Sequence, residues 1–466
     1  MTTALMDHQK EGVAFLTGKR RGLLAFEQGL GKTLVAIDSF RRLREAGETD
    51  RMLVVCPNSL KRNWLAEIAK FAPTLTAEIA EGGSKERRRA FARSVTDVLV
   101  TSYETARIEL TAMLAFTVRQ RVVLVLDESH AAKTWRSLTS TTVRHVAPKC
   151  EYRWLLTGTP VTNAPDDLYT QIEIVAPGEH ALGSLDSFLA RVEADPSAGF
   201  AKSVLDELVL RRTKEECLDL PEKSFADVLV ELPPWQRRLY DQMRAEMVCA
   251  IKAMNGEQYR AYASTALARL TRLSQLASNP ALLFPDVHDT PGKFEVLEGL
   301  VDDILSVPGR KVIIWSTYVK NIEILLGRFA RHGAVAIYGA VEAAQRQDVG
   351  DRFQGDADTR VLVANAAAAG TGFTFTAANY SIYESMSWRF DHYAQSQDRN
   401  HRIGQTRNVS YLRLIAADTI DEAIASALER KSAMARNLLS DADAQFAFSQ
   451  LSPEDMCKLI AENKLP

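Results

Sequence analysis

The fold is decided by the stretch "RGLLAFEQGLGKTLVAIDSF" at residues 21–40. A short apolar run comes first, a loop with two glycines follows, and a second apolar run with helical spacing completes the stretch. This order of strand, glycine-bearing loop and helix is typical of open α/β sheets, whose ligands sit beyond the carboxyl ends of the strands. We therefore expect a parallel sheet, with a binding site where residues 27–33 join the strand to the helix.

The same alternation recurs along the chain. Short apolar runs such as "RMLVVCP" (51–57) and "KVIIWSTY" (311–318) are each followed by turn residues and a longer helical pattern. Alternating strands and helices predict a mostly parallel sheet covered on both faces. Residues 233–279 interrupt the series with a helical pattern that has few strand formers. We predict an α/β protein with an N-terminal α/β lobe, a helical connector, a C-terminal α/β lobe and a helical tail, at residues 1–232, 233–291, 292–434 and 435–466.

Composition limits the class of protein. The chain has 466 residues, of which 46% are hydrophobic and 25% charged, and this is typical of a globular protein with roughly two or three domains. The formal net charge of −2 argues against a protein that coats polyanions indiscriminately, although a local basic face could still bind phosphates. No apolar run reaches the roughly 18 residues of a membrane span, and the N-terminus lacks the pattern of a secretion signal. We expect a cytoplasmic protein with no membrane partner.

The glycine-bearing loop has the residue types that bind phosphate. Gly29 and Gly31 would let backbone N–H groups close around phosphate oxygens. Lys32 would neutralise the β and γ phosphates, and the Thr33 hydroxyl would bind Mg²⁺. The strict P-loop pattern has a further glycine at the position of Phe26, so the match is incomplete. The alternative is a glycine turn with a solvated lysine.

A pair of carboxylates follows another apolar run, in "RVVLVLDESH" (121–130). If this run is a buried strand, Asp127 and Glu128 emerge at its carboxyl end, beside the expected phosphate site. Asp127 would hold Mg²⁺ through water, and Glu128 would act as general base on the attacking water. The alternative is a solvated turn or a helix cap.

Positive charge for phosphoryl transfer could come from "YAQSQDRNHRIGQTRNVSYL" (393–412). On a helical path, Gln395, Arg399 and Arg402 share one face. The two guanidinium groups could then meet the γ-phosphate across a cleft. A solvated basic helix face is the alternative.

With these motifs the chain resembles the Swi/Snf-related double-stranded DNA translocases, a branch of helicase superfamily two. Motifs in the family's order run from "LMDHQKEGVAFL" (5–16) to "TIDEAI" (419–424). "DESH" (127–130) and "GTGFTF" (370–375) are most similar to the annealing-helicase branch of HepA-related proteins, although we do not expect the accessory domains of that branch. The resemblance implies two RecA-like lobes joined by a helical connector, the cofactors ATP and Mg²⁺, and double-stranded DNA as partner.

The resemblance also implies roles for individual residues. The catalytic residues would be Lys32, Asp127, Glu128, Arg399 and Arg402, and Mg²⁺ would be held by Thr33 and Asp127. ATP would be bound by Gln9, which reads adenine, and by Gly29, Leu30, Gly31, Lys32, Thr33, Gly372, Arg399 and Arg402. DNA would be bound by Ser59, Lys61, Ser102, Tyr103, Gly370 and Trp388. Hydrolysis would be coupled to movement by His130, Thr157, Gly158, Thr159 and Gln395.

The chain departs from the family pattern in the second lobe. The family usually opens its coupling motif with a basic residue and glycines, whereas this chain has Ala367, Ala368 and Ala369 before Gly370. After Trp388 the family usually continues with Asn-Pro, and here Arg389 and Phe390 follow. Either Arg389 restores the lost positive charge or it is a solvated side chain.

Other expected DNA contacts also have a structural alternative. The basic cluster "GGSKERRRAFARS" (82–94) could lie along DNA or form a solvated helix face. Tyr103 and Trp388 could stack near DNA or pack in the core. We expect Trp64 in the core because its neighbours are apolar residues at helical spacing.

The expected function is an ATP-dependent motor that translocates on double-stranded DNA, forked or branched DNA included, and remodels DNA structures or protein–DNA complexes. One alternative is a strand-separating helicase or a restriction-type motor subunit. Another is an ATP-gated DNA clamp or scaffold that does not step processively. We expect a monomer, associated with the nucleoid of a bacterium or present in an infected cell if the source is viral. The sequence identifies no recruiting protein.

Overall fold

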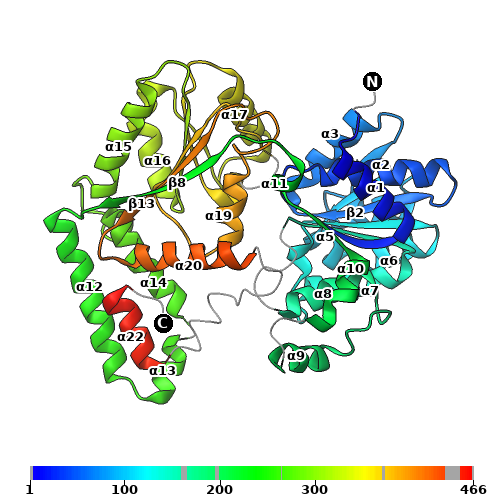
Figure 1. Ribbon diagram of the computed structural model, residues 1–466, viewed down its shortest axis with the longest axis horizontal. Coiled ribbons are helices and arrows are strands. Elements are labelled where there is room, and N and C mark those ends of the chain that lie inside the picture. Colours follow the sequence, from blue (N-terminus) through cyan, green and yellow to red (C-terminus); the bar gives the residue numbers. More distant parts are fainter. Residues whose placement is uncertain are drawn as a thin grey trace. The chain divides into compact units, whose positions relative to one another are not determined.

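The computed structural model describes residues 4–158, 165–194, 199–263, 265–369, 373–435 and 452–463. Within these ranges the chain forms two compact units, which are joined in sequence between Asp219 and Leu220. Each unit has a sheet flanked by helices (Figure 1).

The first unit is built on a seven-stranded sheet with the order β3-β4-β2-β5-β6-β1-β7. All of its paired strands are parallel. Their carboxyl ends therefore lie along one edge, where an α/β sheet binds its ligands. The strands are β1 (Arg21–Phe26), β2 (Arg51–Cys56), β3 (Ala77–Ile79), β4 (Val98–Ser102), β5 (Val122–Asp127), β6 (Tyr152–Leu156) and β7 (Val209–Arg212).

Helices cover both faces of this sheet. On one face, a core cluster joins strand residues such as Leu24 to α1 (Asp7–Lys19), α2 (Lys32–Glu45) and α3 (Lys61–Phe71). On the other face, a second cluster contains Leu23, and neighbouring strand residues thus alternate between the clusters with the period of two of a strand. The helices of this second face are α4 (Ser84–Arg93), α5 (Tyr103–Ile108), α6 (Leu110–Val118), α7 (Leu138–Val146), α8 (Pro165–Val175), α9 (Leu185–Ala194) and α10 (Lys202–Leu208). The short α11 (Lys214–Cys217) follows β7.

The second unit contains a six-stranded sheet with the order β10-β11-β9-β12-β13-β8. Its paired strands are parallel as well. The strands are β8 (Lys223–Val230), β9 (Val312–Trp315), β10 (Val335–Ile337), β11 (Val361–Ala364), β12 (Tyr380–Tyr383) and β13 (Val409–Ala416).

Two core clusters also flank the second sheet. One contains apolar residues of α15 (Gly292–Leu305) and α16 (Val319–Arg328). The other contains residues of α12 (Pro234–Ala253), α13 (Gly256–Ala263), α14 (Ala266–Ser278), α17 (Ala343–Gly355), α18 (Ala366–Ala369), α19 (Phe390–Gln397), α20 (Ile420–Ala435) and α22 (Pro453–Glu462). The connector helices α12–α14 and the tail helix α22 thus share a core with the second sheet.

The division of the chain differs from the expected one at the end of the first lobe. We expected that lobe to end at residue 232, but β8 pairs with β13 over its whole length and belongs to the second sheet. β8 is an edge strand with mostly exposed side chains, so its sequence carries little of the apolar signal that marks a buried strand. The second unit consequently begins before the helical connector.

The two parallel sheets covered by helices confirm the expected α/β fold class. In the part of the chain that the structure describes, no helix combines the length and the apolar character that a bilayer crossing requires.

Candidate functional site

The glycine-bearing loop lies between β1 and α2, at the carboxyl edge of the first sheet. Gly29 and Gly31 have φ angles of 91° and 82°, in the left-handed region that side chains other than glycine rarely adopt. A Cβ atom on Gly31 would also lie 2.5 Å from the Gln9 Nε2 atom. The loop therefore needs both glycines, and loops of this conformation are the ones whose backbone N–H groups bind anions.

Lys32 is the first residue of α2, and its side chain turns back into the loop. Its Nζ atom donates a hydrogen bond to the Phe26 carbonyl oxygen at 2.8 Å, and the residue is 9% exposed. Lys32 is therefore not the solvated lysine of the alternative interpretation. An ammonium group has three donors, so it can reach a phosphate oxygen at the loop while it keeps a backbone contact.

Two residues of α1 hold the middle of the loop. His8 Nε2 lies 3.1 Å from the Leu30 carbonyl oxygen, and Gln9 Nε2 donates to the same oxygen at 3.2 Å. The Gln9 Oε1 atom accepts from the Met6 backbone N–H at 3.0 Å. One N–H and one lone pair of the Gln9 amide remain, and this is the donor and acceptor pair that the edge of an adenine requires. The contact from His8 had no signal in the sequence.

Asp127 and Glu128 emerge at the end of β5, as predicted, and both are buried, with 5% and 8% exposure. Asp127 Oδ1 accepts the Glu128 backbone N–H at 2.9 Å, and Asp127 Oδ2 accepts the Trp64 indole N–H at 2.8 Å. A solvated turn is thus excluded for this pair. Each carboxylate oxygen keeps a further lone pair, so Asp127 fits a hard cation that prefers oxygen ligands.

Burial has the largest effect on the pKa of the Asp127 carboxyl group. Burial and the charge of Glu128 raise its pKa to about 6, against the opposing effects of the Trp64 hydrogen bond and of Lys32. Glu128 has a φ of 48°, which is costly for a residue with a Cβ atom. Strain and a buried carboxylate pair together are features of functional sites.

Trp64 and Tyr103 contact Asp127 in ways that the sequence did not predict. Trp64 is fully buried, as expected for a core residue, but its indole also binds the carboxylate of Asp127. Tyr103 donates its hydroxyl to the Asp127 backbone carbonyl at 2.9 Å. Tyr103 is 5% exposed, so its ring packs in the core, as the alternative interpretation expected. Its DNA-binding role stays a prediction.

The segment after β6 lies beside the glycine-bearing loop. The Thr157 N–H donates to the Leu24 carbonyl oxygen at 3.2 Å, and a Cβ atom on Gly158 would lie 3.7 Å from Lys32 Nζ. His130 Nδ1 lies 3.3 Å from Glu128 Oε2. These positions follow from the sheet order, which places β6 between β5 and β1. Thr159, the remaining coupling residue of this lobe, lies outside the described residues.

The expected DNA-binding residues of the first lobe lie after β2 and β4. Ser59 is exposed and precedes α3, whose first residue, Lys61, places its Nζ atom 3.3 Å from Glu81 Oε2. Ser102 caps α5, because its Oγ atom accepts the Thr105 N–H at 3.1 Å. Their DNA-binding role stays a prediction.

The basic cluster at residues 82–94 has a structural role in part. Glu109 is 2% exposed and accepts hydrogen bonds from Arg87 at 2.9 Å and from Arg88 at 2.8 Å. Two of the clustered arginines therefore neutralise a buried carboxylate. Arg88 nevertheless remains exposed, as expected for a solvated helix face, whereas Arg87 is half-buried. DNA binding by this cluster stays a prediction.

In the second unit, the two candidate arginines lie close together, but not on one helix. α19 ends at Gln397, and the backbone turns at Arg399. Arg399 and Arg402 both donate through Nη1 to the Phe373 carbonyl oxygen, at 3.2 and 3.1 Å, and Arg399 Nε donates to the Gln395 carbonyl oxygen at 3.1 Å. The expected helical path is thus wrong, while the expected proximity is found. Gly370 and Gly372 lie outside the described residues.

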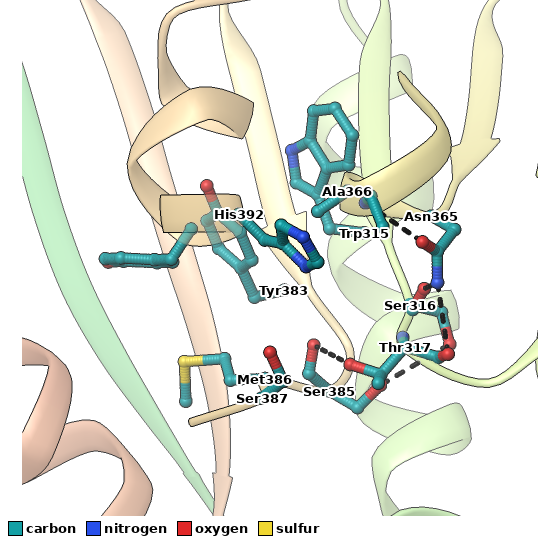
Figure 2. Close-up of a pocket in the computed structure, with 12 residues that line it drawn as sticks. Trp315, Ser316, Thr317, Asn365, Ala366, Tyr383, Ser385, Met386, Ser387 and His392 are labelled. Carbon is teal, nitrogen blue, oxygen red and sulfur yellow. Dashed lines mark hydrogen bonds between the residues drawn. The ribbon is translucent and has the colours of Figure 1, made fainter. Parts of the chain in front are cut away.

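A small pocket opens at the carboxyl ends of β9, β11 and β12 (Figure 2). Thr317, Asn365 and His392 line it from different elements, and the Asn365 Nδ2 atom donates to the Thr317 carbonyl oxygen at 3.1 Å. Ala367, the first of the three alanines that replace the usual opening of the coupling motif, also lines this pocket, as does its neighbour Ala366. Trp388, the other aromatic candidate, is 6% exposed and packs in the core, and its DNA-binding role stays a prediction.

The first unit thus has the features of a P-loop protein: a glycine-bearing loop with a buried lysine and an acidic pair at the same sheet edge. The family model of the SNF2-related domain matches residues 8–282, and that of the helicase conserved C-terminal domain matches residues 292–404. The chain therefore belongs to the SNF2-related family. The resemblance to the Swi/Snf-related proteins is confirmed.

Relatives of the chain are longer proteins. It is 28% identical to an uncharacterized ATP-dependent helicase of Mycoplasma pneumoniae, over 98% of this chain and 44% of that protein. It is 27% identical to the DNA annealing helicase and endonuclease ZRANB3 of Mus musculus, over 94% of this chain and 41% of that protein. Among solved structures, the Sulfolobus solfataricus SWI2/SNF2 ATPase core in complex with dsDNA is 26% identical, with a TM-score of 0.45 over 100% of this chain and 98% of that one. The chain spans less than half the length of these curated relatives.

Proposed function

We propose that this chain is an ATP-dependent motor that translocates on double-stranded DNA and remodels DNA structures or protein–DNA complexes. One observation carries the proposal. The SNF2-related and helicase matches extend over both α/β units, and Lys32 and the Asp127–Glu128 pair lie at the ligand-binding edge of the first one. The relatives named as helicases support the same class of activity.

In this proposal the first unit binds the nucleotide. The loop from Gly29 to Thr33 binds the phosphates, Lys32 neutralises them, and Gln9 reads the adenine edge. Thr33 and Asp127 would hold Mg²⁺, which supplies positive charge for the phosphate oxygens when bound. Glu128 takes a proton from the attacking water.

The second unit contributes Arg399 and Arg402. We propose that these guanidinium groups stabilise negative charge at the γ-phosphate in the transition state. ATP would then bind more tightly to an arrangement in which these arginines reach the γ-phosphate, and this preference would be lost after hydrolysis. Such a differential affinity for two arrangements of the units is what would allow the nucleotide to drive movement. Gln395, His130 and the segment Thr157–Thr159 would couple that change to hydrolysis.

DNA binding in this proposal uses the phosphate backbone. Ser59, Lys61 and Ser102 would contact it from the first unit, and the segment around Gly370 from the second. Such contacts carry no base information, so binding should be independent of sequence and weaken as salt increases.

We expect ATP turnover to be low for the protein alone and to rise strongly when double-stranded DNA is added. The residues proposed to contact the DNA backbone and the proposed catalytic residues lie at the same edge of the first sheet. DNA that binds there can therefore change the rate of hydrolysis. Steady-state phosphate release, measured with duplex, forked and single-stranded DNA and without DNA, tests this expectation. A rate that no DNA changes would contradict the proposal.

The pH dependence of metal binding follows from Asp127. We expect Mn²⁺, a probe for Mg²⁺, to bind the complex with a non-hydrolysable ATP analogue about tenfold more weakly at pH 5 than at pH 8. Since the pKa of Asp127 is raised to about 6, the carboxylate takes up a proton as the pH falls through that value and loses the charge that attracts the metal. Electron paramagnetic resonance titrations would measure this, corrected for binding to the free analogue. The pH dependence that remains after this correction should vanish in Asp127→Asn. If it persists in that variant, Asp127 is not the metal-binding carboxylate.

The alternative of an ATP-gated clamp has one observation in its favour. Ala366–Ala369 form a short helix at the position where the family has a cation, so a DNA contact of the second unit would be weaker. A clamp would hydrolyse ATP without moving along DNA.

A strand-separating helicase would instead unwind forked and blunt duplexes, and a strand-displacement assay distinguishes it.

A further inference from the structure

The two segments of the first unit that are proposed to bind DNA both form a hydrogen bond with Asp127. The first segment contains Ser59, which precedes α3, and Lys61, the first residue of α3. Trp64 lies one helical turn further along α3 and donates its indole N–H to Asp127 Oδ2 at 2.8 Å. Trp64 has no exposed surface, so this hydrogen bond lies in the core.

The second segment reaches Asp127 from another direction. Ser102 ends β4 and caps α5, and the next residue, Tyr103, donates its hydroxyl to the Asp127 backbone carbonyl at 2.9 Å. The order β4-β2-β5 explains the convergence, because the segments after β4 and β2 flank the end of β5 on the same side. One residue therefore receives a hydrogen bond from each segment.

These two contacts are suited to transmit movement. The Trp64 bond joins a buried donor to a charged carboxylate, and such hydrogen bonds are strong where the local dielectric is low. The Tyr103 bond is to a neutral backbone carbonyl and ties the start of α5 to the end of β5. Aromatic side chains have two rotatable bonds and follow the backbone that carries them. A shift of α3 would therefore move the indole donor and reorient the Asp127 carboxylate, whose other oxygen is fixed by the Glu128 N–H at 2.9 Å. A shift of α5 would instead move the backbone that carries this carboxylate.

We propose that Trp64 and Tyr103 are positioning residues that connect the DNA-backbone contacts of the first unit to the metal-binding carboxylate of Asp127. A phosphate backbone bound at Ser59 and Ser102 would act on hydrolysis through these two side chains. The part of the inference that concerns DNA rests on the proposed function. The part that concerns the carboxylate does not.

Two conservative variants test the inference in the full chain. Trp64→Phe and Tyr103→Phe each remove one donor and keep an aromatic ring. For Trp64→Phe, we expect Mn²⁺ to bind the ATP-analogue complex about tenfold more weakly, the scale found when a side chain that orients a metal ligand is changed. For both variants, we expect the ratio of duplex-stimulated to basal turnover to fall severalfold, while the affinity for duplex stays that of the wild type.

The chain provides matched controls. Trp154 is a fully buried tryptophan on β6 whose indole nitrogen has no hydrogen-bond partner among the described residues. Tyr152 is a buried tyrosine of the same strand, and its hydroxyl donates to Glu48 at 2.7 Å. Trp154→Phe and Tyr152→Phe should leave the Mn²⁺ affinity and the stimulation ratio unchanged. Thermal melts of all four variants report whether each one folds.

The outcomes separate this inference from the proposed function. Wild-type values of Mn²⁺ affinity and stimulation in both test variants would overturn it, as would equal losses in the controls. If Trp64→Phe does not fold, Tyr103→Phe, which loses a single hydroxyl, decides through the stimulation ratio. If duplex does not stimulate even the wild type, the proposed function fails. The Mn²⁺ affinity of Trp64→Phe then decides the positioning role alone. A lower affinity supports that role, and an unchanged affinity overturns it.

Discussion

Glu128→Gln should bind ATP with wild-type affinity and hydrolyse it roughly 10²–10⁴ times more slowly. Glutamine has nearly the same shape as glutamate, so the buried end of β5 should keep its structure, but an amide cannot accept the proton of the attacking water. Titration with a fluorescent ATP analogue measures binding, and phosphate release measures turnover.

The control for this variant is Glu104→Gln. Glu104 is an exposed carboxylate that follows β4, near the same edge of the first sheet, and it has no role in the proposed mechanism. Its variant should turn over ATP at the wild-type rate. Normal turnover in Glu128→Gln would mean that Glu128 is not the general base.

Arg402→Ala should leave ATP binding nearly intact and lower turnover by about 10³ or more, the scale of an arginine that stabilises the transferring phosphoryl group. Arg402 and Arg399 share the Phe373 carbonyl oxygen, so their guanidinium groups are held together. The loss should appear in the chemical step, which single-turnover measurements isolate from binding.

Arg407 provides a matched control for this prediction. It lies in the same segment, is exposed, and donates to the Ala377 carbonyl oxygen at 3.0 Å. Arg407→Ala should turn over ATP like the wild type. Wild-type turnover in Arg402→Ala would remove the second unit from the catalytic site.

The parts of the site that the sequence predicts are those that depend on local properties. The glycines of the loop are required by the backbone angles at those two positions, and the acidic pair is placed by the end of one apolar run. A strand, its following loop and the start of the next helix are contiguous, so Lys32 and Asp127 can be placed from their neighbours alone. The parallel sheets follow from the alternation of strands and helices.

The parts that the sequence does not predict depend on contacts between distant segments. Trp64 reaches Asp127 only because β2 and β5 are neighbours in the sheet, and the order of strands is not encoded in any one segment. Arg87 and Arg88 look like a DNA-binding face until Glu109 is found beneath them. In each case the polar partner lies elsewhere in the chain.

β8 and the arginine turn show two other limits. β8 is a mostly exposed edge strand, so it lacks the apolar run by which buried strands are recognised. The spacing of Gln395, Arg399 and Arg402 fits a helix, but α19 ends at Gln397 and hydrogen bonds to backbone carbonyls bring the arginines together instead. Periodicity predicts which residues share a face and not where a helix ends.

Displacement of the third strand from a DNA triplex is the most direct measure of whether this chain moves along DNA. We expect the wild type to release the third strand from a duplex track only with hydrolysable ATP, and Glu128→Gln to release none. Duplex-stimulated hydrolysis that leaves the third strand in place would contradict translocation and leave the clamp as the function.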